Sequence, residues 1–133
     1  MIVVDTSVWV AARRKPNGAL ATALDSLLDK DEVALALPVR IELVSGVARR
    51  ERAGFKRALT ALPVAVPTEE TWPLIARWIE TAADAGHRFG LADLLISALA
   101  HELGALVWTL DADFERMAAL GFVNLYALES PSR

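Results

Sequence analysis

The sequence contains no cysteine, which excludes disulfide frameworks, zinc–thiolate sites, iron–sulfur clusters and cysteine nucleophiles. It also lacks an excess of positive charge, because 14 Lys and Arg stand against 17 Asp and Glu and give a formal net charge of −3. A protein that binds nucleic acid through bulk charge usually has a basic excess. Any nucleic-acid partner would therefore have to be held by a local basic patch or through metal ions.

Long apolar runs and a leader pattern are also lacking. The most apolar stretch, residues 91–110, contains Asp93, His101 and Glu102, which would be costly in a bilayer, so we expect a buried helix and strand there. The start of the chain has no basic segment and reaches Asp5 too early for a secretory signal. These features, with the absence of cysteine, favour a cytoplasmic protein without membrane contact.

What is present indicates one packed domain over residues 1–133. The chain is 54% hydrophobic and 23% charged, without internal repeats or a polar linker, as is typical of a globular domain. Strand-like apolar runs alternate with helical patterns. The runs lie at 2–4, 33–37, 64–66, 105–108 and 122–125, and the helical patterns at 7–12, 19–28, 39–47, 49–62, 71–85, 91–103 and 111–120. This alternation predicts an α/β fold with a central, mostly parallel sheet flanked by helices.

Several carboxylates are predicted to gather at one edge of this sheet. In a parallel sheet with right-handed crossovers, the strand ends and the following helix starts share one edge. Asp5 ends the first strand, and Glu42 lies early in the helix after the second. Asp93 begins the helix before the fourth strand, and Asp111 follows that strand. Asp113, two residues later, is expected to join or flank the group.

Each of these acids also has a structural interpretation. Asp5, Asp93 and Asp111 are residues of the kind that cap or favour the N-terminal ends of helices, and Glu115 could reach back toward Asp111 in a capping box. Glu42 could lie on a solvated helix face, although its apolar neighbours favour burial near a compensating charge. The agreement of all these positions on one edge favours a shared functional site.

Clustered carboxylates raise one another's pKa values unless cations lie between them. Oxygen ligands, without cysteine and with His87 and His101 as the two histidines, favour Mg²⁺ or Mn²⁺ over zinc. The chemistry that uses such a site most directly is phosphodiester hydrolysis, in which metal ions activate a water and stabilise the leaving oxygen. The site requires no protein nucleophile.

These residues resemble the PIN-domain ribonucleases of the VapC type, the toxins of VapBC toxin–antitoxin pairs. Four segments in order carry the resemblance, namely 3–7, 42–46, 91–98 and 109–114. The resemblance implies a PIN-like three-layer sandwich, metal-dependent RNA cleavage, a cognate antitoxin and a homodimer. It makes Asp5, Glu42, Asp93 and Asp111 the catalytic acids and metal ligands, with Asp113 a candidate fifth ligand and with hydroxyl support from Thr6, Ser7 and Thr109.

Two other surfaces carry open interpretations. The basic residues could hold RNA phosphates around the acidic site, or could form solvated helix faces; they are Arg13, Arg14, Lys15, Arg49, Arg50, Arg52, Lys56 and Arg57. The apolar faces of the helices over 39–62 could form a groove for a partner helix, or could belong to the core.

Two other functions remain for comparison. The first is a PIN-like module that binds RNA or a partner protein without cleavage, which the full set of acids disfavours because clustered negative charge without metal repels RNA. The second is another metal hydrolase, such as a phosphatase, which lacks support because no adjacent pair of acids follows the first strand.

Overall fold

The computed structural model describes residues 1–128 and contains one four-stranded parallel sheet in the order β3-β2-β1-β4. The strands are β1 (Ile2–Val4), β2 (Val33–Ala36), β3 (Val64–Ala65) and β4 (Leu106–Trp108). Ile2 of β1 is in register with Val33 on one side and Leu106 on the other. The prediction of a central parallel sheet is confirmed.

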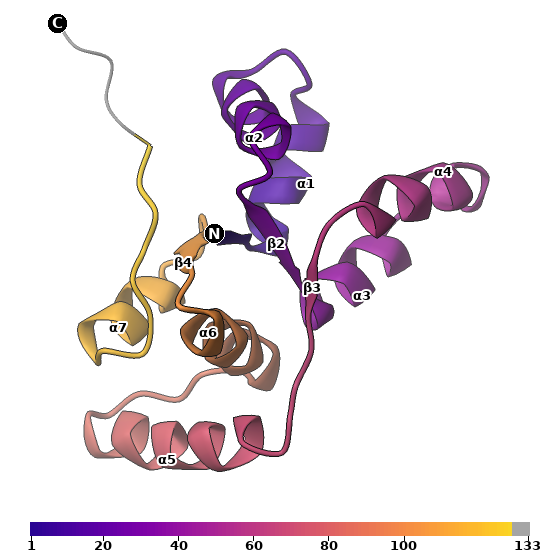
Figure 1. The fold of residues 1–133 in the computed structure, drawn as a ribbon. Coiled ribbons are helices and arrows are strands. Elements are labelled where there is room, and N and C mark those ends of the chain that lie inside the picture. The colour runs from indigo at the N-terminus through magenta and orange to yellow at the C-terminus, as the bar shows by residue number, and fades with distance from the viewer. Residues whose placement is uncertain (129–133) are drawn as a thin grey trace, which may run out of the picture.

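Helices cover the sheet on both faces (Figure 1). They are α1 (Thr6–Arg14), α2 (Ala19–Asp29), α3 (Leu37–Ser45), α4 (Arg49–Thr60), α5 (Thr71–Asp84), α6 (Leu91–Leu103) and α7 (Asp113–Ala119). In Figure 1, α1 and α2 lie above the sheet, α6 and α7 lie below it, and α5 forms the outer side of the lower layer. The pair α3 and α4 lies toward the β3 edge. The result is a three-layer α/β sandwich.

The core lies where α6 crosses the sheet. This helix contacts all four strands, and its buried positions include the small residues Ser97, Ala98 and Ala100, which permit a close approach of helix to strand. Every residue of β1 and β2 is buried, as expected for parallel strands that are covered on both faces. The sheet therefore gives the strand ends a rigid base.

Local signals set the helix ends close to their predicted positions. Pro38 occupies the first turn of α3, where its missing N–H leaves no hydrogen bond unmade. Gly104 ends α6 in the left-handed conformation, at φ 66°. None of the helices within residues 1–128 is both long and apolar enough to traverse a lipid bilayer.

The predicted strand at 122–125 is wrong. The described chain makes a single parallel bridge there, between Val107 and Leu125. Phe122 instead stacks on Trp78 of α5, with ring centroids 4.3 Å apart, and its carbonyl oxygen lies 3.2 Å from Nδ1 of His101. The apolar pattern of this segment thus reflects packing of side chains against α5 and α6, and extended backbone pairing is confined to one position.

Candidate metal centre

The order of the strands creates a crevice at their carboxyl ends. From β1 the chain proceeds outward to β2 and β3, and then returns to place β4 on the other side of β1. Connections that leave neighbouring strands in opposite directions open a crevice where ligands commonly bind in open α/β sheets. Asp5 directly follows β1, and its N–H donates a 2.8 Å hydrogen bond to the carbonyl oxygen of Trp108 at the end of β4.

Asp5 is buried, with 5% of its surface exposed, and two hydroxyl groups hold its carboxylate. Ser7 Oγ donates to Asp5 Oδ2 at 2.7 Å, and Thr109 Oγ1 donates to the same oxygen at 2.9 Å. The carboxylate makes no capping hydrogen bond to the start of α1. Its contacts therefore disagree with the capping interpretation and agree with a carboxylate held in place at the crevice.

The same hydroxyls fix the loop that follows β4. The N–H of Leu110 donates to Ser7 Oγ at 3.0 Å, and the N–H of Asp111 donates to Thr109 Oγ1 at 3.0 Å. One step further, the N–H of Asp113 donates to Asp111 Oδ1 at 2.9 Å. A continuous set of hydrogen bonds thus runs from Asp5 to the first residue of α7.

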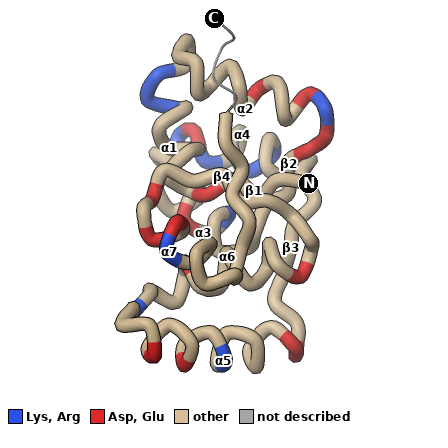
Figure 2. Tube along the Cα trace, turned by 90° about the vertical axis from the view of Figure 1, so that its left-hand side faces the viewer, with Lys and Arg blue, Asp and Glu red and all other residues tan. Residues whose placement is uncertain are grey.

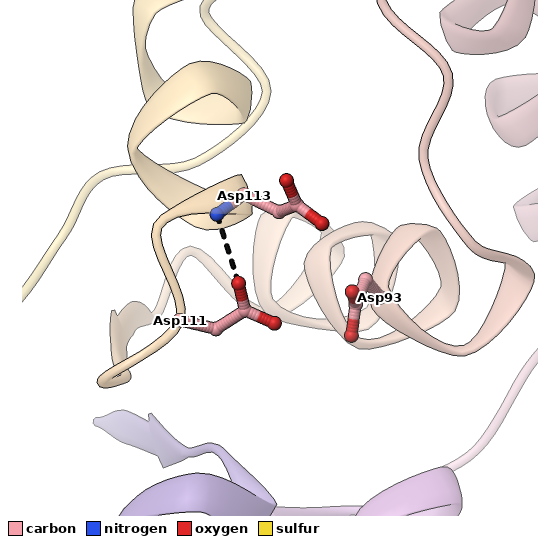
Figure 3. Close-up of side chains that lie close together, drawn as sticks. All are labelled: Asp93, Asp111 and Asp113. Carbon is pink, nitrogen blue, oxygen red and sulfur yellow. Dashed lines mark hydrogen bonds between the residues drawn. The ribbon is translucent and has the colours of Figure 1, made fainter.

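Three aspartates converge at this point, as Figure 3 shows. Asp93 extends from the first turn of α6, Asp111 from the loop after β4 and Asp113 from the start of α7. Each offers a carboxylate oxygen that lies within 4.8 Å of those of the other two. Three such oxygens are close enough together to bind one cation.

Arg116 is a contact of this group that the sequence analysis missed. Its Nη1 donates to Asp113 Oδ1 at 2.7 Å. The spacing of three residues within one helix is the signal that could have identified the pair. This contact gives Asp113 a cationic partner, whereas Asp93 and Asp111 have no ion-pair partner among residues 1–128.

The electrostatics of the crevice centre on Asp93. Its pKa is raised to about 6, first by partial burial and then by the negative charges of four other acids. Those acids are Asp111, Asp5, Asp113 and Glu42, in decreasing order of effect. The other four predicted acids therefore all raise the pKa of Asp93, although the three aspartates of Figure 3 form the tight group.

Glu42 differs from its prediction. Its side chain is exposed on α3, and its main charged neighbour among residues 1–128 is not a compensating cation. Partial desolvation and then the negative charge of Asp5 raise the pKa of Glu42. The hydroxyl of Thr6 opposes this rise, although Thr6 Oγ1 is buried without a hydrogen bond of good geometry in the described chain. Of the apolar residues around Glu42, Val39 and Leu43 enter the core, whereas Ile41 is itself exposed. They therefore did not indicate burial of Glu42 itself.

The donor set fits a hard divalent cation. The tight group consists of carboxylates alone, without histidine, and Mg²⁺ and Mn²⁺ prefer oxygen ligands. Glu42 and Asp5 add negative charge beside it, and Ser7 and Thr109 orient Asp5. Repulsion among these acids would fall on binding a cation.

Comparison with known proteins gives consistent matches along the chain. The family model of the PIN domain matches residues 2–120. Ribonuclease VapC11 of Mycobacterium tuberculosis strain H37Rv is 30% identical over 132 residues, which cover 96% of this chain and 97% of that protein. Ribonuclease VapC18 of the same strain is 30% identical over 122 residues, with 88% of this chain and 87% of that protein covered.

Solved structures with the same fold include chains of VapBC assemblies. VapBC2 from Rickettsia felis, bound to a promoter DNA fragment, matches with a TM-score of 0.77 at 21% identity, covering 97% of this chain and 100% of that chain. VapBC-5 from Mycobacterium tuberculosis, a member of a family of toxin–antitoxin systems, matches with a TM-score of 0.69 at 24% identity, covering 95% of this chain and 97% of that chain. At these identities the likeness is one of fold.

Proposed function

The chain belongs to the PIN-domain family, and from this premise we propose that it is an endoribonuclease that acts as the toxin of a toxin–antitoxin pair. The observation that carries the proposal is the convergence of Asp93, Asp111 and Asp113 at the crevice, beside Asp5 and Glu42. The similarity to VapC ribonucleases over nearly the whole chain supports RNA as the substrate. Residues 1–133 would act as a single PIN domain, in the cytoplasm where RNA is available.

The catalytic residues in this proposal are Asp5, Glu42, Asp93 and Asp111. Together with Asp113 they would hold Mg²⁺ or Mn²⁺, which supplies a lowered water pKa and stabilisation of negative charge on the phosphate and leaving oxygen. The three oxygens within 4.8 Å of one another favour Asp93, Asp111 and Asp113 as neighbouring ligands. The Arg116 contact offsets part of the negative charge of Asp113, which makes Asp113 the weakest ligand of the three in this proposal.

The protein's own contribution is orientation. Ser7 and Thr109 both donate to Oδ2 of Asp5, and no hydrogen bond from residues 1–128 reaches its other oxygen, Oδ1. The carboxylate is thus fixed in direction while one oxygen stays available at the crevice. Holding ligands before the substrate arrives reduces the reorganisation needed in the transition state.

We also infer a binding site for the antitoxin between α3 and α4. A cavity of about 650 Å³ lies there, lined by Leu37, Ile41 and Val44 with Arg52 and Lys56 at the side of α4. Ile41 is 60% exposed, and with Leu37 and Val44 beside it the lining forms an apolar surface that a partner could cover. An amphipathic helix with acidic flanks would match such a groove. We also propose that the chain forms a homodimer, as the family resemblance implies.

The test is cleavage of bulk transfer RNA and ribosomal RNA by the purified chain, with Mg²⁺, with Mn²⁺ and with a chelator. Cleavage should require the metal and should be lost in Asp5→Ala and in Asp93→Ala. Asp84→Ala, which removes an exposed carboxylate at the end of α5, is the matched control and should cleave normally.

Two outcomes would contradict the proposal. Equal cleavage in chelator would contradict the role of the metal. Retention of RNA without cleavage under any metal condition would favour the alternative, a PIN-like binding module.

A further inference from the structure

A second cavity, of about 340 Å³, lies between α1 and α3 and includes Glu42 in its lining. Glu42 and Leu43 line it on the side of α3, Val10 lines it on α1, and Gly46, directly after α3, also lines it. Arg13 and Arg14, in the last turn of α1, complete the lining. One cavity therefore joins a proposed catalytic acid to two guanidinium groups.

The two arginines differ in what holds them. Nη2 of Arg13 lies 3.7 Å from a carboxylate oxygen of Glu51, and its guanidinium carbon lies 4.8 Å from the ring centroid of Phe55. Both partners are on α4, so Arg13 connects α1 to α4. Arg14 forms no ion pair with residues 1–128. Arg14 is therefore the arginine whose charge is available to a ligand in this cavity.

Helix α1 sets the separation between the acids and this arginine. Asp5 precedes its first residue and Arg14 is its last, and nine residues of helix extend about 13 Å. In Figure 2 the basic run at the end of α1 lies at the upper left, and acidic positions lie lower on the same side, near the start of α7. A chain of phosphates leaving the acidic site along α1 would reach Arg14 within a few nucleotides.

The lining favours a phosphate over a base. No aromatic side chain within residues 1–128 borders the cavity, so these residues offer a base no stacking surface there. A guanidinium offers paired N–H donors that match phosphate oxygens, and its charge is independent of pH in the physiological range. The five carboxylates repel an RNA backbone, so its binding also requires a cationic group beside the acidic site.

We propose that the cavity between α1 and α3 is a subsite for an RNA backbone phosphate a few nucleotides from the cleaved bond, with Arg14 as the residue that binds it. This inference rests on the proposed ribonuclease function. Arg14 is a binding residue in this assignment, and Arg13 keeps α1 and α4 together.

The first experiment compares Arg14→Gln with Arg77→Gln. Arg77 lies on α5, at the far side of the molecule from α1 (Figures 1 and 2), so its loss removes the same charge without touching the cavity. The substrate is the shortest synthetic RNA that retains the cleavage site found with transfer or ribosomal RNA. Arg14→Gln should lose about fivefold in kcat/KM, mainly through KM. The salt dependence of its log Kd for the RNA should weaken by about 0.7, the value for one phosphate contact on a single strand.

The second experiment replaces single phosphates of that RNA, one at a time, with uncharged methylphosphonate linkages. With the wild-type protein, one position within about three linkages of the cleaved bond should lose about fivefold in kcat/KM, and Arg14→Gln should show no further loss at that position. Arg77→Gln should keep the wild-type pattern. This loss of additivity identifies a direct contact.

The outcomes separate this subsite from the ribonuclease function itself. If the wild type cleaves RNA while Arg14→Gln retains full kcat/KM, the subsite is overturned and the ribonuclease function stands. The same conclusion follows if a methylphosphonate lowers the kcat/KM of Arg14→Gln at every position as it does for the wild type. If Arg14→Gln cleaves normally but binds the antitoxin less tightly, the cavity belongs to a protein partner and the inference is again overturned. If the wild type cleaves no RNA, both proposals fail.

Discussion

The hydroxyl of Thr109 donates a 2.9 Å hydrogen bond to Oδ2 of Asp5, across 104 positions of sequence. Its oxygen also accepts the N–H of Asp111 at 3.0 Å. One side chain thus joins the ends of β1 and β4 and holds two acids of the candidate site at once. The direction of both hydrogen bonds requires a group that is donor and acceptor, which a hydroxyl provides.

Replacement of this hydroxyl is therefore expected to affect both stability and activity. Thr109→Val keeps the shape but leaves the N–H of Asp111 and Oδ2 of Asp5 each short of a partner, at a cost of about 1 to 3 kcal/mol in the free energy of unfolding. RNA cleavage should fall about tenfold or more, because Asp5 loses its orientation. Urea unfolding and single-turnover cleavage measure the two effects.

Two further variants control this prediction. Thr109→Ser keeps the hydroxyl and should retain most of the activity. Thr60→Val removes an exposed hydroxyl that donates to the carbonyl oxygen of Lys56 within α4, and it should leave cleavage unchanged. Equal activity in Thr109→Val and Thr109→Ser would contradict the orienting role.

Divalent cations are expected to stabilise the fold. A ligand that binds the native state alone at 100 times its Kd adds about 2.7 kcal/mol, which corresponds to a rise in Tm of roughly 5 to 10 °C for a domain of this size. Thermal unfolding with increasing Mn²⁺ measures this shift. Asp93→Asn should abolish most of it and Asp84→Asn should retain it. An equal shift in both variants would mean that the ion binds elsewhere.

The raised pKa of Asp93, about 6, predicts how the stability of the metal-free protein depends on pH. The unfolded residue titrates near pH 3.8, so between this value and 6 the folded state binds the extra proton. Stability from the protonated Asp93 is complete below the lower pKa and is lost as the pH rises through the upper one. Asp93→Asn carries no charge at residue 93 at any pH. The difference in Tm between Asp93→Asn and the wild type should therefore grow in favour of the variant from pH 3.8 to about 6 and stay constant above it.

Solvent limits the size of this effect. Asp93 is half-buried, and with screening we expect about 1 kcal/mol, or a few degrees in Tm. Differential scanning calorimetry of both proteins in chelator from pH 4 to 8 measures it. A Tm difference that stays constant or shrinks with rising pH would contradict the assigned cause.

Two glycines provide a stability test away from the acids. Gly104 has φ 66° at the end of α6, where a β-carbon is strained, so Gly104→Ala should cost about 1 kcal/mol. Gly54 lies within α4, where an added β-carbon would make only an ordinary contact with Nη2 of Arg57 at 3.8 Å, so Gly54→Ala should stabilise by about 0.5 to 1 kcal/mol. Chemical unfolding measures both changes. The same sign for both would disagree with the backbone conformations described.

Much of the fold follows from local patterns that the sequence displays. Apolar runs and helical periodicity located β1 to β4 and α1 to α7 to within a few residues, because parallel strands are apolar on both faces and helices are not. The 122–125 segment was mistaken for a strand because apolar side chains that pack on helices, such as Phe122 on Trp78, give the same pattern as a strand.

The sequence allowed us to predict which acids the candidate site contains, but not the hydrogen bonds that hold them. The edge shared by strand ends and helix starts brought Asp5, Asp93 and Asp111 into one crevice. Which oxygen each hydroxyl binds depends on side-chain geometry across more than one hundred residues of chain, as with Thr109 and Asp5. The exposure of Glu42 likewise depends on how α3 is rotated against the core, which its local sequence leaves open.

The place of β4 beside β1 also governs when the site can exist. During synthesis β1 is made first, and its neighbour β4, with Asp111 and Asp113 behind it, follows only after two further strands and six helices. A nascent polypeptide that stops short of residue 106 lacks an edge partner for Ile2–Val4 and two of the acids. The acidic group of the candidate site is therefore complete only after β4 and the first residue of α7 have been made.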